Sequence, residues 1–510
     1  MARNEQRARS DNVRSGARSV RNGRPTLFIG LATLAYYLLI LGGHQYSIDG
    51  IAMFQAAKTL LFQHSWRFDP PLLWGGTFSV SIWSPGMTFA YVPLLVFWYP
   101  VFVWIPALRA VPYDPSSLHN PALSTNLPYL LCSLLNPLLT AGTACLVFRV
   151  GRLLRLGREW SALAALAYGF ASPAAAYARY DFAQPLAALT LTATILGLLH
   201  AEETGSLRPL AWAGIAFGYG LLTRIEFVVL APWIIGWVYL RCRCAGARGA
   251  CFRAGILAGA IILAILAYLE INRLKFGNPT TGGYPPLSVL FPGSLAHFAQ
   301  GLAGLVVGPP RGLLFFFPLA WLALPGLRAC ARYVTGAWSL FGGVIAISLA
   351  FYAAFRGWGG GAAWGPRFLL PIIPLLALAA AAWAASATGE RRGKRRAVFL
   401  LLSAVGFVVS WNGIFSDPGI FQGMVYETRP LPGTWITPFR LAASSLITGW
   451  LPQPGEPIDL FWVRLASGRL AGNWSGSRLL GSLVPLVLVG VIAWAGLRIG
   501  RDLLRTPDRR

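Results

Sequence analysis

The feature that most constrains this chain is a series of long apolar runs separated by short, arginine-rich loops. The runs are roughly 15–24 residues long, close to the ~20 residues that an α-helix needs to cross the hydrocarbon core of a bilayer. They recur as far as the C-terminal region, so a single cleaved signal peptide does not account for them. A chain that is 55% hydrophobic and only 12% charged is not a soluble globule. The sequence therefore predicts an all-α fold, a polytopic transmembrane helical bundle.

Twelve membrane spans are predicted from these runs. They cover residues 26–43, 126–148, 160–177, 184–200, 209–223, 226–240, 254–271, 312–327, 336–355, 368–387, 397–414 and 479–498. The loops after every second span are 149–159, 201–208, 241–253, 328–335 and 388–396. These loops and the two chain ends hold most of the 43 lysines and arginines, which favours a cytoplasmic position for them. We therefore expect the N-terminus and the C-terminus to lie inside.

One apolar run, residues 87–108, does not fit this count. The run is long enough to span, but a crossing here would turn every later arginine-rich loop outward. Pro93, Pro100 and Pro106 interrupt it, and a proline inside a helix removes a backbone hydrogen bond. We therefore predict juxtamembrane or re-entrant helices that cover a cavity, because such backbone must be buried in protein or line a cavity. If the run does cross, the count becomes thirteen.

A single transmembrane domain, residues 26–498, is expected to make up nearly the whole chain. Residues 1–25 hold seven arginines and are predicted to be a disordered basic cytoplasmic tail, and residues 499–510 form a second cytoplasmic tail. Two long outer loops are expected, 44–125 with the juxtamembrane helices and 415–478. The sequence shows no internal repeat and no segment suited to a separate soluble domain.

The net charge of +25 would suit a nucleic-acid-binding protein, but its distribution does not. The basic residues lie in loops between apolar runs, where membrane topology places them. We therefore expect no nucleic-acid partner. Three of the six cysteines, Cys242, Cys244 and Cys251, share one basic loop without the spacing of a zinc site, and no disulfide is expected.

A single carboxylate, Asp49, stands just after the first span, in the run His-Gln-Tyr-Ser-Ile-Asp-Gly (44–50). Apolar residues at helical spacing follow from Ile51 to Leu61, which suits a helix lying along the membrane surface. The N–H groups at such a helix start favour an ionised carboxylate. Two compatible interpretations are open: Asp49 caps the helix, or it is the general base that takes a proton from a sugar hydroxyl.

Two further acids are expected at the outer face. Asp181 lies in the turn Ala-Arg-Tyr-Asp-Phe-Ala-Gln-Pro (178–185), and Glu226 lies beside Arg224 in the next outer turn. Acids at a membrane boundary are costly unless they are paired or solvated, and they are often functional. We expect Glu226 to form a local ion pair with Arg224. For Asp181, a role in the turn near Arg179 and a role in the site are both open.

Outer cations form the complementary group: Lys275, Arg311, Arg356 and Arg367. Arg311 and Arg367 each follow a Gly-Pro sequence and each precede a span, so both are expected at headgroup depth. A guanidinium there can bind a phosphate through two hydrogen bonds, or it can simply contact lipid headgroups. Because the two arginines enter neighbouring outer turns, the sequence favours a shared phosphate site.

Aromatic residues and histidines give weaker signals. Trp358 and Trp364 flank a glycine run and could stack on a sugar or a prenyl chain, although tryptophans also collect at membrane interfaces for amphipathic reasons. A divalent cation held by His44 and Asp49 is weakly indicated, so whether a metal binds is left open. No Gly-Lys-Ser/Thr phosphate loop occurs, which argues against ATP-driven chemistry.

Three stretches carry a resemblance to a known class of enzymes. They are Tyr-Ser-Ile-Asp-Gly (46–50), Phe-Gly-Asn-Pro-Thr-Thr-Gly-Gly-Tyr (276–284) and Trp-Gly-Gly-Gly-Ala-Ala-Trp-Gly-Pro-Arg-Phe (358–368). With Asp49 after the first span and Asp181 after the third, the chain resembles the polyprenyl-phosphate-dependent glycosyltransferases of the GT-C fold. These include the protein O-mannosyltransferases and the aminoarabinose transferases of bacterial membranes. The resemblance covers about residues 26–390 and leaves 415–478 without a motif.

The resemblance implies roles for particular residues. Asp49 would be the catalytic base, and Asp181 would position a metal ion or the donor. Lys275, Arg311 and Arg367 would hold the donor phosphate. The commoner family motif is Asp-Glu, whereas this chain has Asp-Gly at 49–50, so the second acid is missing.

The resemblance also implies a setting and partners. The protein would be an integral protein of the bacterial plasma (inner) membrane with its active site facing outward. Its partners would be membrane lipid, a lipid-linked sugar donor, and a glycan, lipid or protein acceptor.

Three hypotheses follow, from different functional classes. The first is an inverting sugar transferase that uses a polyprenyl-phosphate sugar and has Asp49 as general base. The second is a flippase or transporter of lipid-linked sugars; against it, the candidate groups cluster at one face, with Glu270 as the only arguable exception. The third is an inactive relative that acts as a scaffold, which the missing second acid keeps open.

Overall fold

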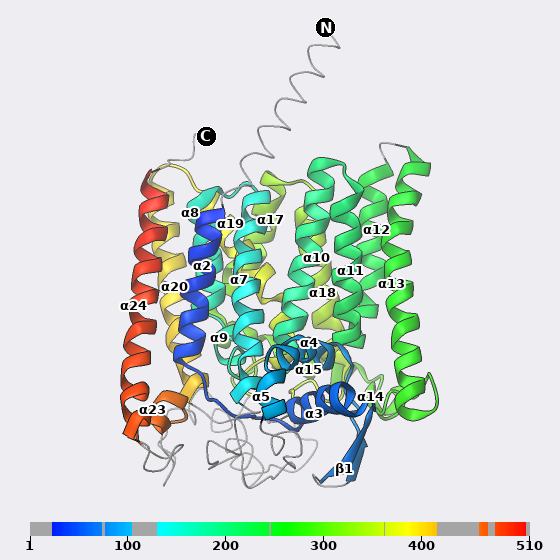
Figure 1. Cartoon of the computed structure of the whole chain (residues 1–510). Helices are drawn as coiled ribbons and strands as arrows, with labels where there is room; N and C mark the ends of the chain where they lie inside the picture. Colours follow the sequence, from blue (N-terminus) through cyan, green and yellow to red (C-terminus); the bar gives the residue numbers. More distant parts are fainter. Residues whose placement is uncertain are drawn as a thin grey trace.

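The computed structural model describes residues 23–73, 77–104, 130–243, 246–361, 363–415, 458–467 and 475–505. Long helices run side by side, and α2 begins and α24 ends at the same end of the bundle, the upper end in the view of Figure 1. The opposite end carries helices that run across the bundle, among them α3. We call it the α3 end.

The long and broken helices of the bundle are α2 (Gly23–Leu39), α7 (Leu135–Leu153), α8 (Gly157–Phe170), α9 (Ala174–Tyr177), α10 (Gln184–Thr204), α11 (Leu207–Thr223), η3 (Ile225–Leu230), α12 (Ala231–Cys242), α13 (Ala247–Phe276), α16 (Leu313–Phe316), η5 (Pro318–Leu322), α17 (Ala323–Tyr333), α18 (Ala337–Ala354), η6 (Arg367–Ile372), α19 (Ile373–Ala385), α20 (Glu390–Phe415) and α24 (Ser475–Arg505). Each of the twelve predicted spans overlaps one or more of them. In the described part of the chain, eight helices are long and apolar enough to cross a membrane. The all-α class is confirmed, and the number of crossings and their orientation stay predictions.

Two predicted spans are interrupted. The span predicted at 160–177 breaks between α8 and α9, where Pro173 precedes the second helix. The span predicted at 312–327 is built from α16, η5 and the first residues of α17, with Pro318 at the start of η5. Both breaks follow from the missing N–H and the fixed φ angle of proline.

The α3 end holds the shorter elements α3 (Ile48–Gln63), α4 (Gly86–Phe97), α5 (Tyr99–Trp104), α14 (Leu287–Leu290), α15 (Leu295–Val307) and α23 (Phe461–Ala466) (Figure 1). The described part of the run 87–108 thus forms two short helices. At 12 residues, α4 is about 18 Å long, well short of the ~30 Å hydrocarbon core. Short helices in place of a span were predicted here; residues 105–108 lie outside the described residues.

A β-hairpin at the same end was not predicted. Strands β1 (Arg67–Leu73) and β2 (Thr77–Val80) pair antiparallel, with Arg67 opposite Val80, Leu73 opposite Thr77 and an irregularity between them. The prolines at 70 and 71 argue against a strand in the sequence, but they are tolerated in a two-stranded sheet whose strands are both edges.

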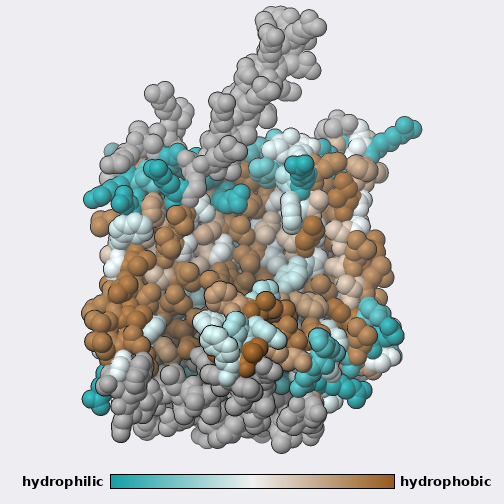
Figure 2. Space-filling model, viewed as in Figure 1, coloured by the Kyte–Doolittle hydropathy of each residue, from teal (hydrophilic) through white to brown (hydrophobic). Residues whose placement is uncertain are grey.

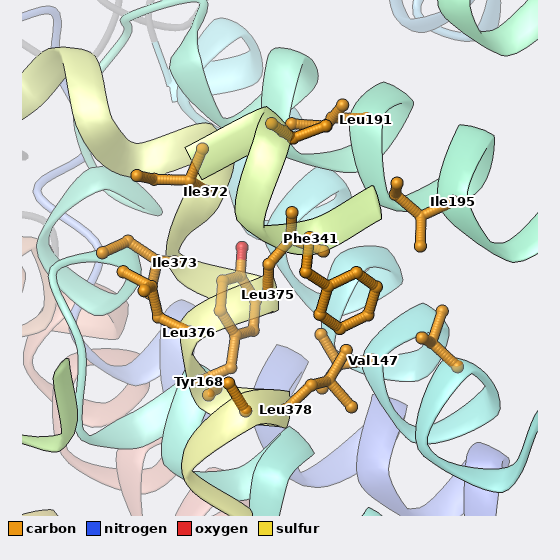
Figure 3. Packing of buried hydrophobic residues seen from close by; sticks show 14 of the residues in the cluster. Val147, Tyr168, Leu191, Ile195, Phe341, Ile372, Ile373, Leu375, Leu376 and Leu378 are labelled. Carbon is orange, nitrogen blue, oxygen red and sulfur yellow. The ribbon is translucent and has the colours of Figure 1, made fainter. Parts of the chain in front are cut away.

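The core is centred on α19, whose residues are almost all buried. An Ala-rich helix that is apolar on every side suits an interior position, and its small side chains let neighbouring backbones come close. Figure 3 shows Leu375 and Leu378 of α19 beside Val147 of α7, Tyr168 of α8 and Phe341 of α18.

The outside of the bundle is hydrophobic around its middle. Figure 2 shows hydrophobic residues over the middle of the visible face, with hydrophilic residues at the upper rim and near the end of α13. Exposed large apolar side chains include Leu263, Leu266, Trp321, Leu324, Leu486, Val487 and Leu497. Such a belt is costly in water and favourable in lipid, as an integral membrane protein requires.

Candidate functional site

Asp49 lies in the first turn of α3, at the α3 end of the bundle. The helix cap is Ser47, whose hydroxyl oxygen accepts a hydrogen bond of 3.1 Å from the N–H of Gly50. The interpretation of Asp49 as the cap is therefore wrong. Its carboxylate forms an ion pair with the guanidinium of Arg367.

Arg367 is held on several sides. Its Nη2 donates to Asp49, its Nη1 donates to the carbonyl of Gly360 at 3.4 Å, and its Cζ lies 3.8 Å from the centre of the Phe182 ring. The side chains of Arg367 and Asp49 are 12% and 17% exposed, so a ligand can reach them. The structure thus brings together two residues that the sequence assigned separately to base and phosphate binding.

A buried amide continues this contact. The amide of Gln184, at the start of α10, is assigned the orientation that faces its oxygen to two donors, because the opposite orientation would leave only donors around its nitrogen. In this orientation the oxygen accepts hydrogen bonds of 3.0 Å from Nε of Arg367 and 3.0 Å from Nη1 of Arg224. Arg224 in turn pairs with Glu226, which confirms the predicted local ion pair. The hydroxyl of Tyr352 donates to the same Glu226 at 2.6 Å. One hydrogen-bonded row therefore runs from Asp49 to Tyr352.

Asp181 is buried beside this row and is bound to the start of α3. Its Oδ1 accepts 2.9 Å from the Ser47 hydroxyl, and its Oδ2 accepts 3.3 Å from the Ser47 N–H. Burial raises the pKa of Asp181 to about 7, although the hydrogen bonds from Ser47 oppose the rise. Of its two open roles, the structure gives it at least a structural one: it anchors the helix that carries Asp49.

Backbone carbonyls of the glycine run between α18 and η6 accept hydrogen bonds from Arg311 and Arg367. Nη2 of Arg311 donates 2.8 Å to the carbonyl of Gly361, and its Nη1 donates 3.4 Å to that of Gly365. Gly360 and Gly361 have φ angles of 79° and 66°, a backbone that favours glycine. Because this loop also binds Arg367, it places Arg311 and Arg367 around one short segment, as the shared site requires.

Three predicted site residues contact groups outside this cluster. The ammonium of Lys275, near the end of α13, donates 2.9 Å to the carbonyl of Trp83, which ties α13 to the juxtamembrane segment. Trp364 is 1% exposed; its Nε1 donates 2.9 Å to Asn412, and its ring meets Phe316 edge-on. Trp364 is therefore a packing residue here, while Trp358 is partly exposed, against Gly304.

Sequence reasoning missed a second cluster around Asp459. Its carboxylate accepts 2.9 Å from His44, 2.7 Å from Tyr46 and 2.6 Å from Arg179, and it also pairs with Arg464. The backbones of the same two segments are also joined, because the N–H of Phe461 donates a hydrogen bond of 2.7 Å to the carbonyl of Leu41. The predicted loop 415–478 thus has a described part, from 458, that fastens the segment before Asp49. No sequence motif indicated this cluster.

Tyr284 also belongs near the site. Burial raises the pKa of its hydroxyl, the charge of Arg224 opposes the rise, and Glu226 and Asp49 add to it. The residue as a whole is 47% exposed. The signal in the sequence was its place at the end of the stretch 276–284.

The described residues do not fit a divalent-cation site. They contain no group of three or more His, Cys, Asp or Glu side chains that could hold a metal ion. His44 bonds Asp459, and Asp49 pairs with Arg367, so whether these two residues share a metal stays open. Asp181 has its oxygens on Ser47. We assign no step to a metal.

Comparison with known proteins gives distant structural similarities. No protein-family model matches this chain, and no curated protein matches it in sequence. ArnT from Cupriavidus metallidurans in the apo state is 15% identical, with a TM-score of 0.47 over 93% of this chain and 75% of that one. The same protein bound to undecaprenyl phosphate is 15% identical, with a TM-score of 0.46 over 94% of this chain and 76% of that one.

A third similar structure is the archaeal oligosaccharyltransferase AglB from Archaeoglobus fulgidus in complex with an inhibitory peptide and a dolichol-phosphate. It is 10% identical, with a TM-score of 0.47 over 90% of this chain, which spans 59% of its length. These proteins are of the GT-C class that the motifs resemble. Because the TM-scores are below 0.5, the chemistry proposed next rests on the residues of this chain.

Proposed function

We propose that this chain is a membrane glycosyltransferase that moves a sugar from a polyprenyl-phosphate donor to an acceptor hydroxyl, with inversion at the anomeric carbon. The observation that carries the proposal is the ion pair of Asp49 and Arg367 at the α3 end. It puts a carboxylate that can accept a proton next to a guanidinium that can bind a phosphate. The setting suits a lipid-linked donor, because the pair lies at one end of a bundle with an apolar outer belt.

The chemical step needs no co-reactant. The acceptor oxygen forms the new bond to the anomeric carbon while its proton passes to the carboxylate of Asp49. The bond between the anomeric carbon and the phosphate oxygen breaks, and its electron pair stays on the polyprenyl phosphate. Attack from the side opposite the phosphate gives inversion, and positioned proton removal typically contributes about 10²–10⁴ in rate.

The ion pair couples the two halves of this step. In the resting site the charges of Asp49 and Arg367 compensate each other. When Asp49 takes up the proton it becomes neutral, which leaves the positive charge of Arg367 without a counter-charge. At the same moment the departing phosphate gains negative charge, which Arg367 can stabilise. Arg311, held by the same glycine segment, is the second proposed phosphate ligand.

Lys275 is a proposed donor ligand only if its ammonium leaves the carbonyl of Trp83. We propose a sugar-stacking role for Trp358 rather than for the buried Trp364. The active site would face the outside of a bacterial plasma membrane, and the acceptor would be a glycan, a lipid or a protein.

The test is transfer of labelled sugar from a polyprenyl-phosphate donor in membranes that contain the wild-type protein or Asp49→Asn. We expect a loss of at least about 100-fold from the missing base. Glu270→Gln is the matched control, because this acid is exposed and, within the described part of the chain, its ion pair is with Arg273 of its own helix. Activity of Asp49→Asn within twofold of wild type, in a folded protein, would exclude Asp49 as the base. Movement of the labelled lipid-linked sugar across vesicle membranes, without formation of a transfer product, would favour the hypothesis of a flippase or transporter.

A further inference from the structure

Gln184 is the one residue through which the two arginines of the charged row meet. Donor nitrogens of Arg367 and Arg224 each lie 3.0 Å from its side-chain oxygen, so they are no more than 6.0 Å apart. Two guanidinium groups at this distance repel each other unless an acceptor lies between them. The amide oxygen has two lone pairs, and both are used.

The far side of each arginine is fixed by other groups. Arg224 is bound to Glu226 and lies with its Cζ 5.3 Å from the centre of the Phe368 ring, which is stacked on Tyr352. Arg367 is bound to Asp49 and lies over Phe182. Gln184 is 1% exposed at the first position of α10, so its position is set by the bundle.

The charges of the row balance while Gln184 is neutral. Two guanidinium groups face the carboxylates of Asp49 and Glu226, and the amide adds nothing to the sum. A proton that reaches Asp49 therefore leaves the row with one net positive charge, which a phosphate bound there can compensate. A carboxylate in place of the amide would keep both hydrogen bonds but would give the row a net negative charge.

We propose that Gln184 is a positioning residue that holds Arg367 and Arg224 together as a paired phosphate site, and that its neutrality leaves their charge available to the donor. The inference rests on the proposed function and adds Arg224 to the phosphate ligands. Gln184 itself touches no reacting atom; it acts through the two arginines.

The experiment measures binding of farnesyl phosphate to the full chain in detergent, with farnesol as the uncharged control ligand. Gln184→Glu keeps the shape and both acceptor positions but adds a charge. We expect it to bind farnesyl phosphate at least tenfold more weakly than wild type and farnesol equally, with a thermal midpoint no lower than that of wild type. If Gln184 only stabilised the fold, Gln184→Glu would not weaken binding of farnesyl phosphate. Charge-assisted bonds to two arginines are stronger than neutral ones, so the variant would hold both arginines at least as firmly.

Two further variants complete the test. Gln184→Met removes the acceptor at similar size, and Arg224→Met removes one arginine; each should weaken farnesyl phosphate binding about tenfold, as expected for losing a hydrogen bond to a charged group. Thr192→Val on the same helix is the control, because its hydroxyl bonds only to Ala188 of its own helix. Phosphate affinity of Gln184→Glu and Gln184→Met within twofold of wild type would overturn the inference alone. A wild-type protein that neither binds farnesyl phosphate nor transfers sugar would overturn the proposed function with it.

Discussion

The carboxylate of Asp181 lies against the backbone of Gly50, in the space that a Cβ atom at position 50 would need. The same carboxylate is bonded to Ser47, which caps the helix of Asp49. This relationship accounts for the glycine that follows Asp49. A side chain at 50 has no room, and a second acid would stand against Asp181.

Gly50→Ala is therefore expected to displace Asp181 and to shift the first turn of α3. Overpacking of this kind costs about 1–3 kcal/mol, so the thermal midpoint should fall and transfer activity should drop with it. Gly259→Ala in α13 is the control, because a Cβ atom there meets nothing within 4 Å. Equal thermal midpoints for the two variants would contradict the close approach of Gly50 and Asp181.

The buried acid also predicts a pH dependence of stability. The pKa of Asp181 is about 7 in the folded chain and 3.8 as its ordinary value, so between these values the folded state binds more protons than the unfolded state. Stability contributed by this group therefore falls as pH rises from about 4 to about 7, by an upper limit of about 4 kcal/mol. Asp181→Asn, which resembles the protonated form, should raise the thermal midpoint more at pH 8 than at pH 5. A gap that is the same at both pH values would rule out the raised pKa.

Arg367→Lys tests the geometry of the arginine rather than its charge. An ammonium cannot reach Asp49, Gln184 and Gly360 together as the guanidinium does. We expect kcat/KM for the lipid donor to fall about tenfold or more, chiefly through a higher KM, while the protein stays folded. Arg356→Lys, at an exposed position in the same outer turn, should behave like wild type. Wild-type kinetics for Arg367→Lys would show that two-point phosphate binding is not needed.

The cluster at Asp459 predicts a contrast between a buried and an exposed ion pair. Asp459→Ala leaves the guanidinium of Arg179 buried without its counter-charge, which typically costs about 3–5 kcal/mol. Glu270→Ala removes the acid of an exposed pair with Arg273, which water screens, so this variant should change stability very little. Thermal unfolding in detergent should separate the two variants clearly. A small effect at Asp459 would mean that the segment from 458 does not hold the first loop.

The orientation of the bundle can be tested without a substrate. The arginine distribution predicts that residues 201–208 lie inside and that 272–311 lie outside. In a background with the six native cysteines replaced, Thr280→Cys should react with an impermeant thiol reagent in intact cells. Glu203→Cys should react only after the membrane is opened. The reverse pattern would place the proposed site on the cytoplasmic side.

The sequence predicted the helices well because each depends on local apolar length. The span expected at 184–200, for example, is α10, Gln184–Thr204. The contacts between side chains could not be predicted in this way, because they join distant parts of the chain. Asp49 and Arg367, for example, are 318 residues apart. Both were named as site residues, but no spacing rule relates them. The shared oxygen of Gln184 and the grip of Asp459 on His44 depend likewise on packing, which periodicity does not encode.

The contacts between the segment from 458 and residues 38–46 bear on the order of events during synthesis. Helix α2 emerges from the ribosome early, yet it packs along α24, which is translated last. The carbonyls of Leu38 and Leu41 accept hydrogen bonds from Trp462 and Phe461, which are also translated late. Until those late residues are translated, Arg179 has no carboxylate from Asp459. A nascent chain can therefore insert most of its helices without completing the loop that carries Asp49. If Asp49 acts as proposed, activity should arise only when the last helix is in place, and half-made chains would be inactive.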